Sequence, residues 1–297
     1  MSRAVAMHSD NVRYCGRSFT VAQMEAIRAL IVDNPRASRV RLSQLVCQIL
    51  DWRRLDGRLK DMSCRVAMLR MQDDELIQLP PPRNGNNNGR PYHRRTPQAE
   101  PEVLPVASSA GDLLDLRLEM VSTRAQSLLW NEYIDRYHYL GYQPLPGAQL
   151  RYVVWANDRI LALLGFGAAA WKTAPRDRFI DWTVEQRKLR LHLIVNNARF
   201  LILPWVHCRN LASRLLAMAT RRLADDWQQC YGYRPVLAET FVEVPRFRGT
   251  CYKAANWIYL GQTRGRGKLD VHHKAQLPIK SIWVYPLVKD FHRQLCI

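Results

Sequence analysis

The sequence has 297 residues, of which 47% are hydrophobic, which is enough for one large domain or two unequal domains with packed cores. Its 44 Lys and Arg residues against 26 Asp and Glu residues give a formal charge of +18 and a pI near 10. A charge excess of this size speaks about partners and not about fold, and nucleic acid is the simplest polyanionic partner.

Membrane-spanning and disulfide-stabilised proteins are two classes that the sequence argues against. The longest nearly apolar run, residues 160–171, is shorter than the roughly 20 residues that a helix needs to cross a bilayer. The N-terminal segment lacks the apolar stretch of a signal peptide. The seven cysteines are scattered and contain no C-x-x-C pair, so we expect neither a disulfide framework nor a zinc site. We expect a reduced, cytoplasmic protein without membrane contact.

The N-terminal part predicts a small helical module. Residues 1–19 show no clear periodicity and are expected to form a loose arm. A first helix begins at Thr20, a suitable N-cap, and stops at Pro35; a second begins after Arg41; a third spans about 62–73. A short strand follows and is closed by the prolines of LPPPR, which cannot continue it.

This order of elements over residues 20–83 is the outline of a winged helix-turn-helix DNA-binding domain. In that arrangement the last helix enters the major groove and the wing touches the backbone. The candidate DNA contacts are Lys60, Arg65 and Arg70. A small helical bundle that binds protein remains the alternative for this module.

Residues 84–111 predict a flexible linker. The stretch NGNNNGRPYHRR is rich in turn residues, and the following residues are prolines and small side chains. We therefore place a domain boundary here, with the second domain over residues 112–297.

The second domain alternates helices and strands. A helix is expected over residues 122–137, a strand over 149–156, a hairpin turn at Asn157-Asp158 and a return strand over 160–171. The later expected elements are a helix over 182–190, a strand within 191–205, a helix over 210–223, a strand within 234–243, a helix over 250–258 and a strand over 281–287. This order predicts an α/β fold with a mixed sheet.

Long and unusual motifs occur in this second domain. They include RYHYLGYQPLPGAQLRY, LGFGAAAWKTAPRDRFIDW, IVNNARFLILPWV and FRGTCYKAANWIYLGQTRGRGK. On these motifs, the region from about Trp130 to Leu287 resembles the family of the Druantia anti-phage system protein DruA, a domain also found beside transposases. The resemblance implies a defence or mobile-element protein that works on DNA, with defence-system or transposon proteins as partners.

A second resemblance concerns the fold. The segments FLILPWVHCRNLASRLLAMATRRL and AANWIYLGQT resemble the core strand, helix and later short helix of the GNAT acetyltransferases. This implies a mixed-sheet GNAT-like core preceded by the winged helix, and makes a coenzyme A-dependent acyltransferase the alternative function. Two departures count against acyl transfer: the turn HCRNLAS has no glycine for a pyrophosphate to approach, and Trp257 stands where that family often has a tyrosine acid.

Three residues are the candidates for catalysis on a DNA strand. Glu239 follows an apolar run at the end of a predicted strand and could act as a general base or metal ligand, or form an ion pair with an arginine. Cys251 and Tyr252 begin a predicted helix, where the macrodipole would lower the pKa of the thiol and favour a nucleophile. Both could equally be buried packing residues. Mg²⁺ is expected only if the protein is a nuclease, and no other cofactor is expected.

The stretch from Arg246 to Lys268 is the predicted nucleic-acid surface. It holds six Lys and Arg residues and no Asp or Glu, and its glycines let the backbone approach a ligand. The candidate contacts are Arg199, Arg246, Arg248, Lys253, Trp257, Arg264, Arg266 and Lys268, with Trp257 able to stack on unpaired bases. We expect a DNA-binding protein that takes duplex and also single-stranded DNA, that could form a homo-oligomer, and that could cleave or transfer a strand.

Overall fold

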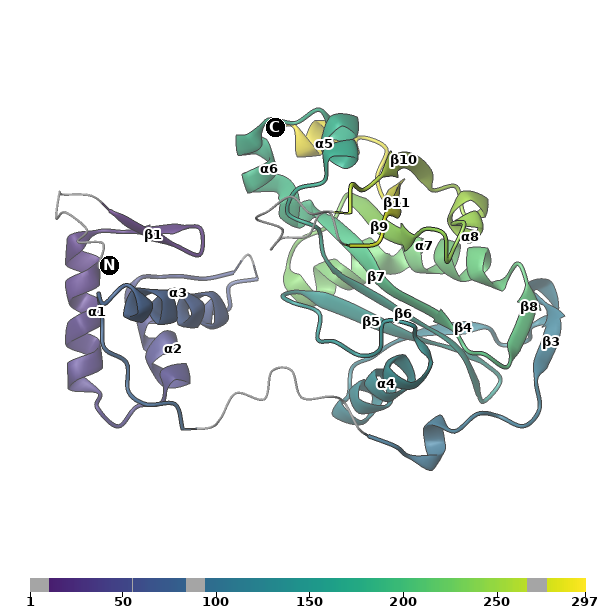
Figure 1. The fold of residues 1–297 in the computed structure, drawn as a ribbon, viewed down its shortest axis with the longest axis horizontal. Coiled ribbons are helices and arrows are strands. Elements are labelled where there is room, and N and C mark those ends of the chain that lie inside the picture. The colour runs from purple at the N-terminus through teal and green to yellow at the C-terminus, as the bar shows by residue number, and fades with distance from the viewer. Residues whose placement is uncertain (1–10, 55, 84–93, 266–276) are drawn as a thin grey trace. The chain divides into compact units, whose positions relative to one another are not determined.

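The computed structural model describes residues 11–54, 56–83, 94–265 and 277–297 and divides into two compact units (Figure 1). The first unit is Met1–Arg90 and the second is Pro91–Ile297. No helix among the described residues is long and apolar enough to cross a membrane.

The first unit contains a hairpin and three helices. Their bounds are β1 Val12–Tyr14, β2 Arg17–Phe19, α1 Val21–Asp33, α2 Arg39–Ile49 and α3 Asp61–Asp73. Thr20 caps α1, since its hydroxyl accepts from the N–H of Gln23 while the Gln23 side chain accepts from the N–H of Thr20. The three predicted helices are therefore confirmed, and they enclose a core that includes Phe19, Ile27, Leu42, Val46 and Met68.

Two expectations for this unit are wrong. The described part of the expected loose arm, residues 11–19, forms the β1–β2 hairpin, in which the apolar Phe19 reaches the helical core. The short strand expected before the prolines of LPPPR does not form: residues 74–83 pair with no strand, although Ile77 and Leu79 are buried against the helices. The wing of a winged helix is thus not seen in its predicted place. The segment is held by the burial of Ile77 and Leu79 and not by pairing with another strand.

The second unit is built on a seven-stranded mixed sheet in the order β10-β11-β9-β7-β6-β5-β4 (Figure 1). The strands are β4 Arg117–Met120, β5 Gln149–Ala156, β6 Arg159–Ala168, β7 Ile194–Ile202, β9 Leu237–Glu243, β10 Ile258–Gln262 and β11 Lys280–Pro286. Neighbouring strands are antiparallel except β7 and β9, which are parallel and pair only over Ile194–Asn196. The predicted α/β fold with a mixed sheet is confirmed.

Helices cover both faces of this sheet. The α-helices are α4 Arg124–Tyr137, α5 Ala174–Ile180, α6 Val184–Arg190, α7 Leu211–Tyr231, α8 Thr250–Ala254 and α9 Phe291–Leu295. Neighbouring side chains of β5 show the two faces: Arg151 donates to Asn131 on α4, and Tyr152 donates to Asp226 on α7. Because successive side chains of a strand point to opposite faces, α4 and α7 lie on opposite sides of the sheet (Figure 1).

The close packing of α4 depends on a glycine in β6. A Cβ placed on Gly165 would lie 3.0 Å from Cζ2 of Trp130, so only glycine lets this indole rest on the strand. The Trp130 Nε1–H donates to the carbonyl of Tyr152 at 3.2 Å. Helix α4 is in this way fixed at one angle on the sheet.

The second half of the expected linker belongs to the second unit. Thr96 donates its N–H and its hydroxyl to the buried carboxylate of Glu132 on α4, and Ala99 is fully buried. The shorter elements here and farther along are the 3-10 helices η1 Pro97–Ala99, η2 Ala110–Asp112 and η3 Leu191–Leu193 and the two-stranded parallel sheet of β3 Val106–Ser109 and β8 Val206–Arg209. Residues 94–111 therefore belong to the second unit, although Val103 and Leu104 are exposed, and the expected linker over 84–111 overlaps this unit.

Candidate nucleic-acid interface

Glu239, a predicted catalytic residue, lies in a buried ion pair. Its Oε2 is 2.9 Å from Nη1 of Arg176, and both side chains are 0% exposed. Its Oε1 accepts from the N–H of Ala170 at 2.8 Å. Burial raises the pKa of Glu239, and the Arg176 guanidinium opposes this rise. The ion-pair alternative, and not an accessible general base, is what the geometry supports.

A second carboxylate, Asp177, binds the same arginine. Its Oδ1 is 2.8 Å from Nη2 of Arg176 and accepts from Nε1 of Trp182 at 3.2 Å. In the described parts of the chain no group of three His, Cys, Asp or Glu side chains is arranged to hold a metal ion. The carboxylates near α5 therefore meet around a guanidinium.

Tyr252, the second catalytic candidate, is buried at the start of α8. It is 6% exposed, and its hydroxyl donates to Oδ1 of Asn197 at 2.8 Å and receives a hydrogen bond from Thr240. Burial raises its pKa, and Trp257 packs edge-on against its ring at 5.1 Å. A phosphodiester cannot reach this hydroxyl without displacing the core, so the geometry supports a packing role.

For Cys251, the third catalytic candidate, the pKa of the thiol is shifted in the direction opposite to the one expected. Burial raises the pKa of its thiol, whereas a position at a helix N-terminus is expected to lower it. Helix α8 has only five residues, which is too few to build a strong macrodipole. The surroundings of the thiol therefore give no support to an activated thiolate, which stays a prediction.

Trp257, which was expected to stack on unpaired bases, is buried. It is 4% exposed and packs between Tyr252 and Tyr285, with ring centroids 5.1 and 5.8 Å away. An indole buried in this way cannot stack on a base in solution. The exposed aromatic residues of this stretch are Phe247, which is 45% exposed, and Tyr259 on β10, which is 50% exposed and lies 5.2 Å from the Trp283 ring.

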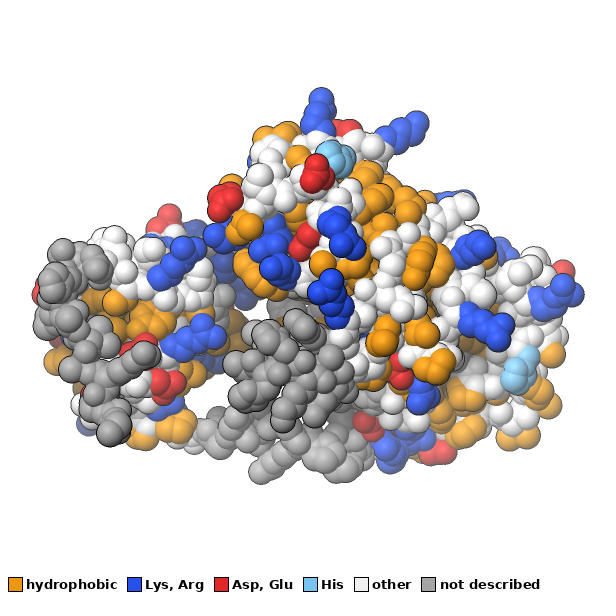
Figure 2. Space-filling view, turned by 45° about the horizontal axis from the view of Figure 1, so that its top comes forward, with side chains coloured by type: hydrophobic (Ala, Val, Ile, Leu, Met, Phe, Trp, Pro, Cys, Tyr) orange, Lys and Arg blue, Asp and Glu red, His pale blue; other side chains and the backbone are white. Residues whose placement is uncertain are grey.

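The predicted basic residues around α8 are at the surface. Arg246, Arg248, Lys253 and Arg264 are all exposed, while Arg266 and Lys268 lie outside the described residues. Arg246 has two partners: its Nε is 3.5 Å from Glu243, and its guanidinium lies 4.8 Å from the centre of the Tyr139 ring. Figure 2 shows Lys and Arg side chains spread among hydrophobic ones, with fewer Asp and Glu side chains.

Arg199 on β7 adds a partly buried positive charge. Its Nη1 donates to the carbonyl of Ala198, its Nε is buried without a hydrogen-bond partner, and burial lowers its pKa. Burial, together with the charge of Arg199, lowers the pKa of His138 to about 4. No carboxylate of the described residues forms an ion pair with Arg199, so this charge is free to attract an anion.

The predicted DNA contacts of the first unit differ in how exposed they are. Lys60 and Arg65 are half-buried at the start of α3, and Arg65 lies 3.4 Å from Asp61. Arg70, in the last turn, is exposed. These three residues remain predictions as DNA contacts.

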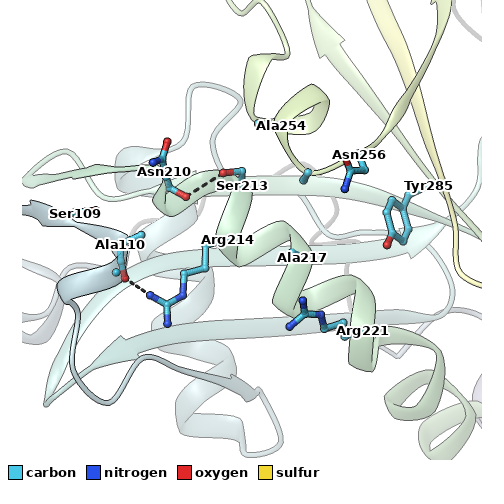
Figure 3. A pocket seen from close by; sticks show the side chains of 12 residues that line it. Ser109, Ala110, Asn210, Ser213, Arg214, Ala217, Arg221, Ala254, Asn256 and Tyr285 are labelled. Carbon is cyan, nitrogen blue, oxygen red and sulfur yellow. Dashed lines mark hydrogen bonds between the residues drawn. The ribbon is translucent and has the colours of Figure 1, made fainter.

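A pocket of about 440 Å³ lies beside the first turns of α7 (Figure 3). Arg214 and Arg221 point from α7 toward it, and Asn210 precedes the helix with a left-handed φ of 61°. Arg214 donates to the carbonyl of Ala110, and Ser213 donates to the carbonyl of Asn210 at 3.0 Å. The sequence did not single out this pocket, because its lining comes from four segments far apart in the chain.

This pocket fits coenzyme A only in part. Its two arginines suit an anionic group. The preceding turn lacks glycine, and the buried Trp257 has no proton that could serve a leaving group. We therefore derive no acyl-transfer step from it.

Comparison with solved structures finds similarity to acetyltransferases. A Drosophila melanogaster polyamine N-acetyltransferase is 13% identical, with 57% of this chain and 100% of that chain covered and a TM-score of 0.36. The Escherichia coli ribosomal-protein-S18-alanine N-acetyltransferase is 10% identical, with coverages of 58% and 94% and a TM-score of 0.35. A Bacillus subtilis acetyltransferase in complex with CoA is 10% identical, with coverages of 59% and 100% and a TM-score of 0.33. Identities this low carry no information about activity.

Sequence comparison identifies the family. No curated protein matches the chain. The family model described as "Druantia protein DruA" matches residues 71–276, which is more than half of the chain and includes most of the second unit. The chain belongs to the Druantia protein DruA family.

Proposed function

We propose that this DruA-family protein is a DNA-binding component of an anti-phage defence system or a mobile element. One observation carries the proposal: the predicted basic residues on and beside α8 are at the surface, and the chain from Arg246 to Lys268 contains no acidic residue. A folded surface of this kind attracts phosphates, since each Lys or Arg that neutralises a phosphate releases condensed counterions.

The proposal is one of binding, because the catalytic candidates have other roles in the fold. Glu239 is neutralised by Arg176, and Tyr252 is bonded to Asn197 inside the core. The thiol of Cys251 has a raised pKa. Strand cleavage by these residues has no support from their geometry.

The test is DNA binding by the purified full chain, measured by fluorescence anisotropy at a series of salt concentrations. We expect the logarithm of the affinity to fall linearly with the logarithm of the salt concentration. The variant R248Q/K253Q should reduce the magnitude of that slope by about 2, or roughly 1 for each phosphate that is no longer neutralised. R293Q is the control for removing one exposed positive charge elsewhere, because Arg293 is 78% exposed on α9. Absent or salt-independent binding would refute the proposal.

Acyl transfer from coenzyme A is the second candidate. The observation in its favour is the pocket beside α7, where Arg214 and Arg221 bring positive charge to the N-terminal half of a long helix. The DNA proposal has the stronger support, because binding through exposed basic residues needs no general acid, whereas acyl transfer does.

A further inference from the structure

Two aromatic rings from distant parts of the chain meet at the surface of the second unit. Tyr139 follows α4 and is 37% exposed, and Phe247 lies between β9 and α8 and is 45% exposed. Their ring centroids are 5.3 Å apart at an interplanar angle of 61°. The guanidinium of Arg246 lies 4.8 Å from the centre of the Tyr139 ring. We refer to Tyr139, Arg246 and Phe247 as the aromatic–arginine platform.

The loops that carry this platform are held by the fold. The buried ring of His138 stacks on Tyr139 at 4.8 Å, and the carbonyl of His138 accepts from the N–H of Gly141 at 2.8 Å. On the other side, the N–H of Phe247 donates to the carbonyl of Glu243 at 2.9 Å, and Arg246 pairs with the Glu243 side chain. Because the fold already holds these side chains, binding a ligand would cost little of their conformational entropy.

A further exposed ring lies next to the Phe247 segment. Gly249, two residues along, takes a φ of +70°, and a Cβ on it would come within 2.8 Å of the Trp283 indole. The Trp283 ring lies 5.2 Å from that of Tyr259. Trp283 therefore contacts both the segment that follows Phe247 and the ring of Tyr259, which is 50% exposed.

The charges around the platform indicate which class of ligand it binds. Arg248 is exposed next to Phe247, and Arg199, which lies close enough to Tyr139 to affect its pKa, has no carboxylate partner among the described residues. The acidic residue at the platform, Glu243, is 17% exposed and already paired with Arg246. The exposed ring of Phe247 and the Arg246 guanidinium that lies on Tyr139, beside uncompensated positive charge, suit a ligand with flat apolar rings and a negatively charged backbone.

We propose that the aromatic–arginine platform stacks on unpaired bases, so that the second unit binds single-stranded DNA in preference to duplex. The inference rests on the proposed DNA-binding function and specifies its substrate. In a duplex the faces of the bases are stacked on each other, whereas a single strand can turn them toward Phe247 and toward the Arg246 guanidinium that Tyr139 supports. The phosphates between the bases then face Arg246 and Arg248.

The decisive variant changes the rings and not the charge. Y139L/F247L should lower the affinity for a single-stranded oligothymidylate by about tenfold or more, because stacking contributes appreciably for each base. Its duplex affinity and its salt slope should stay as in the wild type. R248Q should instead weaken both substrates alike and reduce the magnitude of the salt slope by about 1. Thermal unfolding of each variant checks that the fold is retained.

Stacking itself can be read from a fluorescent base. A single strand that contains 2-aminopurine should be quenched when the wild-type chain binds it, and Y139L/F247L should recover the fluorescence at saturating protein. Equal affinity of the wild type for single strand and duplex, or an unchanged single-strand affinity in a folded Y139L/F247L, would overturn the platform while leaving DNA binding intact. Absence of binding to either DNA would overturn the proposed function itself.

Discussion

Arg176 and Glu239 face each other with both side chains fully buried, and Nη1 of the arginine is 2.9 Å from Oε2 of the glutamate. The two residues come from α5 and β9, so the pair connects a short helix to the centre of the sheet. A buried pair of this kind is costly to break, because the remaining charge is left without compensation in a low-dielectric interior.

We therefore expect E239Q to lower the free energy of unfolding by about 3–5 kcal/mol. Urea denaturation followed by circular dichroism measures this change. E185Q is the control, since Glu185 is 75% exposed and its contact with Lys188 is 3.9 Å long, so its effect should be below about 1 kcal/mol. A fully stable E239Q variant that had lost a DNA-processing activity would instead support a catalytic Glu239.

His138 should make stability depend on pH. Burial lowers its pKa from 6.5 to about 4, and its Nδ1 accepts from the N–H of Leu140, which requires the neutral ring. The unfolded chain therefore binds the proton first, and stability should fall as the pH decreases from about 6.5 toward 4. H138Q should flatten this part of the stability–pH curve, whereas H207Q, at an exposed position, should not. The same dependence in H138Q and wild type would contradict the assignment.

Gly165 should be intolerant of a methyl group. A Cβ there would lie 3.0 Å from Trp130, and the indole is held by its hydrogen bond to Tyr152. G165A should cost about 1–3 kcal/mol through overpacking, measured as a lower urea midpoint. G111A is the matched control, because its Cβ would meet nothing closer than 4.0 Å. Equal midpoints for the two variants would show that α4 can move away from the strand.

Tyr252 should matter for stability, and neither Tyr252 nor Cys251 should matter for DNA chemistry. Y252F leaves Oδ1 of the buried Asn197 without its donor and should cost about 1–3 kcal/mol of stability. C251A should leave both stability and DNA affinity close to wild type. Both variants should bind DNA with the wild-type salt slope. Loss of a DNA-cleaving activity in stable Y252F or C251A protein would restore the nucleophile hypothesis.

Coenzyme A should leave the melting temperature unchanged, while a single-stranded oligonucleotide should raise it, because only a ligand of the native state stabilises it. The reason is that the turn before α7 offers no glycine and that Arg214 already donates to the carbonyl of Ala110. Differential scanning fluorimetry with each ligand tests this. A rise with coenzyme A that R214Q abolishes and R293Q retains would favour the acyltransferase candidate.

Much of the fold was predictable because local patterns and tertiary packing agree. The strand Gln149–Ala156 has the expected bounds, and Asn157 takes the positive φ of a tight hairpin turn. Helix α7 runs beyond the predicted end at Leu223 to Tyr231, where Gly232 caps it with a φ of 77°. The helix expected to reach Ile258 ends at Ala254 instead, because pairing with β11 draws Ile258 into β10.

The site was less predictable, since burial is a property of the folded chain. The sequence suggested functional roles for Glu239, which precedes the basic stretch, and for Tyr252 and Trp257 within it, and each of the three faces the interior. It also passed over Tyr139 and Phe247, although an aromatic residue beside a basic one was visible at Arg246-Phe247. Nothing in the order of residues states that these two rings meet.

The sequence by itself determined the large positive charge, the helices of the first unit, the mixed α/β order of the second and the membership in the DruA family. These follow from composition, from periodicity and from long motifs, all of which are local or summed properties of the chain. Only the tertiary structure decided which residues of the Arg246–Lys268 stretch are buried and which are exposed, and that Arg246 lies on Tyr139. The physical reason is that contacts between distant segments arise when the sheet and its helices bury apolar surface together.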